Sequence, residues 1–433
     1  MDNPRRLALN SLVKTESSGA YSNLEINTVL SRAKMSGVDC ALYTALYLGV
    51  VEKLLTLDYQ ISIHSKIALD KLDIETKNAL RLGLYQLIYM DKIPEYSAVF
   101  ETVSLCKMKA KGFVNACLRS FIRGGREIAL PSEKWEALSV KMSVPVALID
   151  IFRESYGDEI AEKIVLACEQ REGTFLRINN IKADPREIRS TLKSRGIQYA
   201  HAGFSEDVIR VKAPISEVAD LLEDGFVFVQ DPASLLCVKA LDAKKGEKIL
   251  DACACPGGKS FSSAVEMENE GEIVCCDLHA RKLSLVQNGA KKLGIDIIST
   301  MEQDASKRRD EFCDAFDRVL CDVPCSGLGV IAKKPDIKYK SVDQLRALPK
   351  IQLAILKNCA GYVKVGGVLV YSTCTLNAEE NEKIVQKFLE ENDSYEIFDF
   401  DLGEAKSTSG MLTLLPHVYE TDGFFVARMR RVK

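Results

Sequence analysis

The sequence lacks an uninterrupted apolar run of about 18 residues, the length that a membrane-spanning helix needs. Its first residues, Met1 to Arg6, contain no apolar core of a secretory signal, so we expect a cytoplasmic chain that does not enter a membrane. The composition, 47% hydrophobic and 27% charged, is that of a globular protein and excludes disordered and fibrous classes. At 433 residues the chain has room for roughly two to four domains.

Histidine is scarce, with four in the chain, and the 14 cysteines are scattered. Cys253 and Cys255 do not have the spacing of a zinc knuckle, and the only histidine near them is His279. We therefore predict no metal site. In the reducing cytoplasm the cysteines are expected to be free thiols, mostly small core side chains.

An excess of positive charge is also absent. The formal net charge is −3, which argues against a strong non-specific nucleic-acid binder. Local basic clusters occur at three places: Lys107, Lys109 and Lys111; Lys333, Lys334, Lys338 and Lys340; and Arg428, Arg430, Arg431 and Lys433. Taken alone, each cluster is more typical of a solvated surface than of an RNA contact.

Four segments differ in their patterns. Residues 1–125 have apolar residues at helical spacing and end at two glycines, which predicts an all-helical domain. Residues 126–170 have the pattern of a helical connector, with prolines 131 and 145 at helix starts. Residues 171–230 predict a small α/β unit, suited either to contact RNA or to serve as a structural adaptor. Residues 231–433 form the last domain.

The last domain alternates strands and helices. The predicted strands cover residues 248–252, 273–277, 317–322, 367–372 and 424–429, with a short strand before Asp304. Apolar, β-branched strands that alternate with helices predict a parallel, doubly wound α/β sheet of the Rossmann-like class. In such a sheet, ligands bind at the carboxyl ends of the strands.

The first of these strands leads into a glycine turn. The turn fits neither the GxGxxG dinucleotide fingerprint nor the spacing of a P-loop, which argues against a nicotinamide-dependent dehydrogenase. Asp277 ends the next strand, where it could accept both ribose hydroxyls of a nucleoside, and Asp304 could meet an adenine amino group. Together these features predict an adenosine-type cofactor. The predicted cofactor-binding residues are Cys253, Ala254, Cys255, Pro256, Gly257, Gly258, Lys259, Asp277, Asp304 and Asp322.

Two cysteines follow neighbouring predicted strands. Cys325 lies in the loop after Asp322, and Cys374 follows the next strand, before a helix predicted to start at Ala378 with Asn377 as its cap. One strand-end cysteine is ordinarily an inert core thiol, but two at one edge favour a reactive thiolate, which a helix amino terminus also stabilises. Three acids in that first turn oppose this effect, because they raise a thiol pKa: Glu379, Glu380 and Glu382.

A thiolate beside an S-adenosylmethionine site suits methylation of a pyrimidine carbon. Carbon 5 of cytosine is a poor nucleophile, but a thiolate that adds to carbon 6 converts the ring into an enamine whose carbon 5 can accept a methyl group. Asp322 is placed to stabilise this adduct at ring nitrogen 3. A base must then remove the carbon 5 proton so that the thiol can leave. The spacing alone does not choose between the two cysteines as nucleophile.

The motifs together resemble the RNA cytosine-5 methyltransferase family, the Sun/Fmu and NOL1/NOP2 group. The segments that carry the resemblance are residues 251–260, 322–327, 334–338 and 372–375, with Asp277 and Asp304. The resemblance implies a class I S-adenosylmethionine-dependent RNA (cytosine-5-)-methyltransferase, with Cys374 as the nucleophile and Cys325 assisting product release.

A second resemblance lies at the front of the chain. Residues 81–87, 92–99 and 112–119 look like a NusB-type RNA-binding helical domain. This pairing is similar to the family's 16S ribosomal RNA enzymes, which implies 16S ribosomal RNA as substrate and no DNA; we expect a monomer. Small departures are Cys255 for alanine, Thr375 for serine, and Lys333-Lys334 for arginine. The alternatives are a transfer RNA substrate, or a non-catalytic NusB-like RNA-binding factor, since some such domains bind only proteins.

Overall fold

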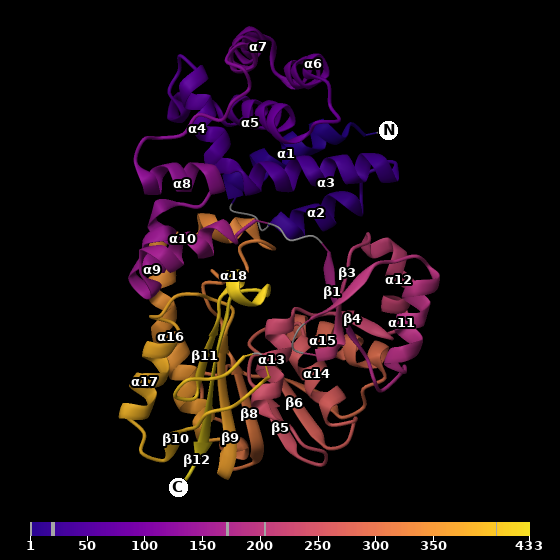
Figure 1. Ribbon diagram of the computed structural model, residues 1–433, viewed down its shortest axis with the longest axis vertical. Helices are drawn as coiled ribbons and strands as arrows, with labels where there is room; N and C mark the ends of the chain where they lie inside the picture. The colour runs from indigo at the N-terminus through magenta and orange to yellow at the C-terminus, as the bar shows by residue number, and fades with distance from the viewer. Residues whose placement is uncertain (1, 19–21, 170–172, 203–204, 404) are drawn as a thin grey trace. The chain divides into compact units, whose positions relative to one another are not determined.

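The structure, a computed structural model, describes residues 2–18, 22–169, 173–202, 205–403 and 405–433. The chain divides into two compact units. The first contains residues 1–169 and 331–340, and the second contains residues 170–330 and 341–433. Figure 1 labels their helices and strands.

The first unit is built from helices around one apolar core. They are α1 (Pro4–Ser18), α2 (Ser22–Leu30), α3 (Gly37–Glu52), α4 (Leu54–His64), η1 (Leu69–Lys71), α5 (Ile74–Tyr89), α6 (Glu95–Leu105), α7 (Met108–Arg123), α8 (Lys134–Met142), α9 (Val146–Tyr156) and α10 (Asp158–Leu166). Tyr43, Leu46, Leu80 and Phe121 are fully buried in this core. The segment is helical as predicted, and α7 ends at Arg123 before the two glycines, but the compact unit continues to residue 169.

The predicted connector packs into the same unit through hydrogen bonds to α4. Thr56 Oγ1 donates to the carbonyl of Val140 at 2.5 Å, and Gln60 Nε2 donates to the carbonyl of Ala129 at 3.0 Å. Pro145 is the N-cap of α9, as expected. The expectation that Pro131 starts a helix is wrong, because the N-cap of α8 is Glu133.

A segment from the second half of the sequence also belongs to the helical unit. Residues 331–340 contain the turn η4 (Pro335–Tyr339). Lys338 is only 2% exposed, its Nζ donates to the carbonyl of Glu52 at 2.9 Å, and Tyr339 packs against the helical core. The sequence pattern counted Lys338 in a basic surface cluster. Its burial corrects that interpretation and shows that the two units are not contiguous in sequence.

The second unit begins with a four-stranded antiparallel sheet. Its elements are β1 (Thr174–Ile178), α11 (Pro185–Ser194), β2 (Tyr199–Ala202), β3 (Ser205–Val211), η2 (Ile215–Val218), α12 (Ala219–Glu223) and β4 (Val227–Val229). The strand order is β2-β3-β1-β4, a βαββαβ arrangement. The buried Asn179 Nδ2 joins this sheet to the rest of the unit by donating to the carbonyls of Gly225 at 2.9 Å and Leu293 at 2.8 Å.

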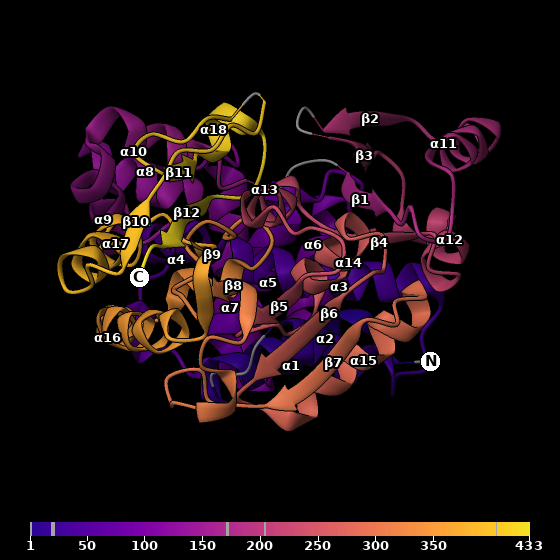
Figure 2. The same cartoon turned by 90° about the horizontal axis from the view of Figure 1, so that it is seen from below.

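The larger sheet of this unit carries the predicted α/β pattern. Its strands are β5 (Lys248–Asp251), β6 (Glu272–Asp277), β7 (Ile298–Glu302), β8 (Phe316–Asp322), β9 (Val363–Thr373), β10 (Tyr395–Ile397), β11 (Met411–Leu414) and β12 (Phe424–Arg431). They lie in the order β10-β12-β9-β8-β5-β6-β7, with β11 on β12. The run from β9 through β7 is parallel, as predicted, and Figure 2 shows these strands following one another across the sheet.

The far side of the sheet differs from the prediction. β12 pairs with β9 in the antiparallel direction, and β10 and β11 pair antiparallel with β12. The sheet is therefore mixed. The sequence pattern did not reveal this because a buried strand has the same apolar, β-branched residues in either direction.

Helices cover both faces of the larger sheet. α13 (Pro232–Leu241), α14 (Gly258–Glu266) and α15 (Ala280–Leu293) pack on one face, and α16 (Val342–Ala360) and α17 (Glu382–Glu390) pack on the other. Alternate strand residues point to opposite faces, so Ile249 packs with the first group and Leu250 with the second. The short elements η3 (Asp310–Phe312) and α18 (Pro416–Tyr419) lie in loops.

Within the described ranges, no single helix combines the length and apolarity of a membrane span. α3 and α4 meet that test only when taken together, and they are bent by 77° at their junction.

We predict that Lys338 makes the stability of the protein depend on pH. Burial lowers the pKa of Lys338 from 10.5 to about 8. The unfolded chain then binds its proton more tightly than the folded chain, so the free energy of unfolding rises with pH between about 8 and about 10.5. Lys338→Met removes this titration. The melting temperature of the wild type, minus that of Lys338→Met, should increase between about pH 7.5 and about pH 9.5 in calorimetry.

The matched control for this experiment is Lys334→Met, which changes an exposed lysine of the same segment. The difference in melting temperature between the wild type and Lys334→Met should stay constant over the same pH range. A constant difference for Lys338→Met as well would contradict the prediction.

Candidate active site

The carboxyl ends of the parallel strands meet at one edge of the larger sheet. In the spatial order β7, β6, β5, β8, β9, the side chains at or just beyond these ends are Asp304, Asp277, Asp251, Asp322 and Cys374. Strand pairing thus places four acids in a row that leads to a cysteine.

The glycine turn links β5 to α14. Gly257 has φ +113°, and an added Cβ would lie 2.4 Å from the ring of Phe261, so only glycine fits there. The backbone N–H of Ala254 donates to the carbonyl of Cys276 at 2.8 Å, which fixes the turn above β6. Residues Cys253 to Lys259, predicted to bind the cofactor, therefore lie together at the edge, and Gly258 begins α14.

The two thiols of this turn are held neutral. Burial raises the pKa of Cys253 well above its usual value. Burial and the carboxylate of Asp277 raise the pKa of Cys255 to about 12. Neither cysteine therefore provides a thiolate near neutral pH.

Two acids of the row have hydrogen bonds to local backbone. Asp277 Oδ1 accepts from the N–H of His279 at 2.9 Å. Asp304 Oδ1 accepts from Ser306 Oγ at 2.6 Å and from the N–H of Ser306 at 3.0 Å, and the hydroxyl bond is the main cause that lowers the pKa of Asp304. Both carboxylates are half-buried at the edge.

Asp322 is held by two donors at the end of β8. Lys259 Nζ donates to Asp322 Oδ2 at 2.6 Å, and Ser372 Oγ donates to Asp322 Oδ1 at 2.9 Å. Burial disfavours the Lys259 ammonium, but the carboxylate of Asp322 and the nearby Cys237 and Cys374 raise the pKa of Lys259 above its usual value. Lys259 therefore remains a cation beside Asp322 and Cys374.

The two predicted catalytic cysteines are in contact. Cys325 Sγ and Cys374 Sγ are 3.3 Å apart, and both residues are half-buried free cysteines. The hydrogen bond to Cys374, burial, and the charges of Glu380 and Asp322 raise the pKa of Cys325 well above its usual value. Cys325 is therefore a neutral thiol that can donate its proton to the sulfur of Cys374.

The residues after Cys374 differ from the prediction. α17 begins at Glu382, with Asn381 as its N-cap, so the helix does not start at Ala378 and its amino terminus does not lie directly at Cys374. Asn377 instead holds a turn, where its Oδ1 accepts from the N–H of Glu379 at 3.2 Å. The acids also differ in role: Glu379 pairs with Lys383, Glu382 accepts from Thr413, and Glu380 adds charge at Cys325.

The residues at this edge fit S-adenosylmethionine. That molecule carries a cationic sulfonium, an ammonium group and a ribose with two hydroxyls. The acids Asp277, Asp304 and Asp322 supply the complementary charge and the acceptors for a diol, and the glycine turn provides backbone close to the edge. No group of three or more His, Cys, Asp or Glu side chains arranged to hold a metal ion occurs in the described part of the chain.

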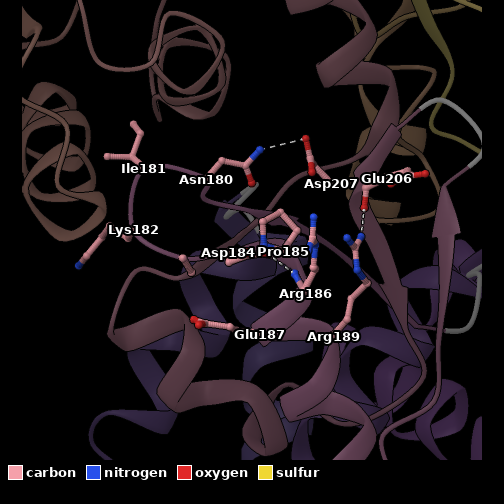
Figure 3. Close-up of a pocket in the computed structure, with 11 residues that line it drawn as sticks. Asn180, Ile181, Lys182, Asp184, Pro185, Arg186, Glu187, Arg189, Glu206 and Asp207 are labelled. Carbon is pink, nitrogen blue, oxygen red and sulfur yellow. Dashed lines mark hydrogen bonds between the residues drawn. The ribbon is translucent and has the colours of Figure 1, made fainter.

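A hollow of about 770 Å³ lies elsewhere, beside the start of α11 in the small sheet. Figure 3 shows its polar side chains bonded to one another: Asn180 Nδ2 donates to Asp207 Oδ2 at 3.1 Å, and Arg189 donates to the carbonyl of Glu206 at 3.0 Å. It contains none of the predicted site residues, so we assign it no role.

Sequence reasoning missed two features of the edge. It placed Lys259 in the cofactor loop, whereas its ammonium is bonded to Asp322. It also counted Glu380 as an acid in the first turn of a helix, whereas this side chain lies before α17 and is fully buried between the two cysteine loops. Both facts depend on contacts between segments far apart in the sequence, and no local pattern marks them.

The mixed sheet and the acid row at its edge define the class as an S-adenosylmethionine-dependent methyltransferase. The family model of the 16S rRNA methyltransferase RsmB/F matches residues 238–430, the NusB family matches residues 2–123, and a ferredoxin-like domain of RsmF/B-like methyltransferases matches residues 144–217. The chain belongs to the 16S rRNA methyltransferase RsmB/F family.

Curated relatives match along almost the whole chain. The "Probable ribosomal RNA small subunit methyltransferase B" of Bacillus subtilis is 37% identical over 99% of this chain and 98% of its own length. The "Ribosomal RNA small subunit methyltransferase B" of Escherichia coli K12 is 32% identical, over 92% of this chain and 91% of its own. These identities over the full length confirm the family resemblance found in the sequence.

Solved structures share the fold. The crystal structure of PH0851 has a TM-score of 0.82 at 23% identity and covers 100% of this chain and 99% of its own. A methyltransferase homolog protein from Pyrococcus horikoshii has a TM-score of 0.61 at 25% identity, over 70% of this chain and 100% of its own.

We predict that Asp277→Ala weakens the binding of S-adenosylmethionine. Hydrogen bonds to a charged group contribute about 1.5–3 kcal/mol each, so the loss of this carboxylate should raise Kd by about tenfold or more. Isothermal titration calorimetry measures the change. Asp296→Ala, which removes an exposed acid before β7, is the control and should bind like the wild type. Equal affinity in both variants would exclude Asp277 from the cofactor site.

Proposed function

We propose that this chain methylates carbon 5 of a cytosine in 16S ribosomal RNA, through a covalent bond between the base and Cys374. The observation that carries the proposal is the contact between Cys325 and Cys374, 3.3 Å apart, beside an Asp322 that is bonded to Lys259. A chain that only bound RNA would have no use for two thiols, an acid and a half-buried cation at one strand edge.

Cys374 is the nucleophile in this proposal. Its sulfur adds to carbon 6 of the cytosine, and its proton passes to ring nitrogen 3 through Asp322, so that charge does not accumulate on the ring. Lys259 stabilises the negative charge on Cys374 while Asp322 carries the proton, and on Asp322 once the proton has passed to the ring. The nearby cation therefore replaces the helix amino terminus that the sequence predicted.

S-adenosylmethionine supplies an electrophilic methyl group on its sulfonium. Carbon 5 of the adduct takes this methyl group and must then lose its proton. Cys325 gives its thiol proton to the sulfur of Cys374 as the bond to carbon 6 breaks, and accepts the proton from carbon 5 in exchange. The proton on ring nitrogen 3 returns to Asp322 and passes to solvent, as the one proton that the net reaction releases. Both cysteines end as they began, and the raised pKa of Cys325 keeps its proton in place until the bond to carbon 6 breaks.

The substrate proposal rests on the family and the names of the relatives. The name of the family and the names of the curated relatives specify methyltransferases of small-subunit ribosomal RNA. The target cytosine must leave its stack to reach the edge of the sheet, as bases do in other base-modifying enzymes. A transfer RNA substrate would use the same catalytic residues. Membership in a methyltransferase family argues against the non-catalytic alternative.

We predict that Cys374→Ala abolishes methyl transfer and leaves cofactor binding intact, because the side chain acts only on the base. Transfer of tritium from labelled S-adenosylmethionine to 16S ribosomal RNA measures turnover, and bisulfite sequencing identifies the modified cytosine. Cys313→Ala, a half-buried thiol elsewhere in the unit, is the matched control and should stay active. Wild-type rates in Cys374→Ala would refute the nucleophile assignment.

A second variant tests the release step. Cys325→Ala should trap the protein on RNA as a covalent adduct. Cys374 can still attack the base, but the thiol of Cys325, which exchanges protons during release, is missing. The adduct should appear as a slow band on a denaturing gel and should vanish in the double variant Cys325→Ala/Cys374→Ala. An active Cys325→Ala without such a band would contradict the release role.

A further inference from the structure

We propose that Glu380 is a positioning residue that holds the two cysteine loops together and thereby controls release of the methylated base. This inference rests on the proposed function. Glu380 lies in the loop after Cys374 and is fully buried. Its effect is exerted through the loop that carries Cys325.

The carboxylate of Glu380 accepts three hydrogen bonds. Oε2 accepts from the backbone N–H of Ser326 at 2.9 Å and from Gln352 Nε2 at 2.8 Å, and Oε1 accepts from Asn377 Nδ2 at 3.0 Å. Because all three partners are donors, both oxygens act as acceptors. Ser326 directly follows Cys325 in the chain. The bond from its N–H therefore lets Glu380 fix the backbone that carries the Cys325 thiol.

Gln352 extends the contact to a third segment. It lies on α16, is fully buried, and its Nε2 also donates to the carbonyl of Pro324 at 3.0 Å. The carbonyl oxygen of Pro324 and Oε2 of Glu380 are both acceptors, so the NH2 group of the Gln352 amide, and not its oxygen, must face them. Pro324 and Ser326 flank Cys325 on either side. The loop is therefore held at two points, one directly and one through Gln352.

Other bonds also join the same two loops, one of them through the hydroxyl of Ser326. Ser326 Oγ and Thr375 Oγ1 are 2.6 Å apart, and the N–H of Gly329 donates to the carbonyl of Cys374 at 3.0 Å. These contacts hold the loops side by side. The backbone on both sides of Cys325 depends on Glu380 and Gln352, so their loss should move this sulfur away from Cys374.

The test uses the full-length protein and a gel assay for the covalent RNA adduct. Glu380→Met removes the acceptors with little change in volume, and should raise the amount of adduct at least about fivefold over wild type, the effect of about one lost hydrogen bond. Gln352→Met, which acts from α16, should do the same. Glu380→Gln should keep much of the release, because its one oxygen can still accept from Ser326 and Gln352. Asn377 then turns its amide toward the new NH2 group and gives up its bond to the N–H of Glu379.

The controls separate this inference from the proposed function. Glu379→Gln changes the exposed neighbour and should behave like wild type, and Cys325→Ala is the positive control for the adduct. Suppose that Cys325→Ala traps RNA, and that Glu380→Met and Gln352→Met fold and bind the cofactor but trap no RNA. The role of Glu380 is then overturned. If Cys325→Ala itself gives no adduct, the proposed release step fails instead.

A second readout does not depend on catalysis. Diamide oxidises two thiols to a disulfide and is itself reduced to the hydrazine. With sulfurs 3.3 Å apart, Cys325 and Cys374 of the wild type should crosslink readily, and mass spectrometry detects the bond. Glu380→Met and Gln352→Met should crosslink at least about fivefold more slowly, and Glu379→Gln at the wild-type rate. Unchanged crosslinking in both buried variants would overturn the proposal.

Discussion

The parallel pairing of β8 with β9 is the constraint on which the active site depends. Its register sets Asp322 opposite Ser372, so the loops that follow the two strands start side by side. Cys325 and Cys374 are close only because both strands run in the same direction and end at the same edge. Had the pairing shifted by one residue, alternation would have turned Asp322 to the opposite face of the sheet.

The edge combines several acids with the half-buried cation of Lys259. Asp277, Asp304 and Asp322 suit a cofactor with positive charge, whereas a thiolate needs the opposite environment. Lys259 reconciles these demands, because it is bonded to Asp322 and also lies near Cys374. Cys325 stays protonated among the same charges. The proposed chemistry needs such a protonated thiol in contact with the attacking sulfur.

Sequence reasoning succeeded where the pattern is local. The helical start of the chain, the glycine turn, the acids at the strand ends and both cysteines follow from periodicity and motif, and they lie where expected. It failed where the partner of a segment decides the outcome. β12 is antiparallel to β9, residues 331–340 pack with the helical unit, and α17 begins at Glu382 instead of Ala378. The residues of a segment do not show in which direction a strand runs or which other segment it packs against.

The sequence by itself determined which residue types stand at the ends of which strands, because alternation and turn residues act over a few positions. That is enough to name the cofactor class and the pair of cysteines. Only the tertiary structure decided that Lys259 bonds to Asp322, that the two sulfurs are in contact, and that Glu380 is buried between their loops. Lys259 and Asp322 are 63 positions apart, Cys325 and Cys374 are 49 apart, and Ser326 and Glu380 are 54 apart, and such separations close only when the sheet assembles.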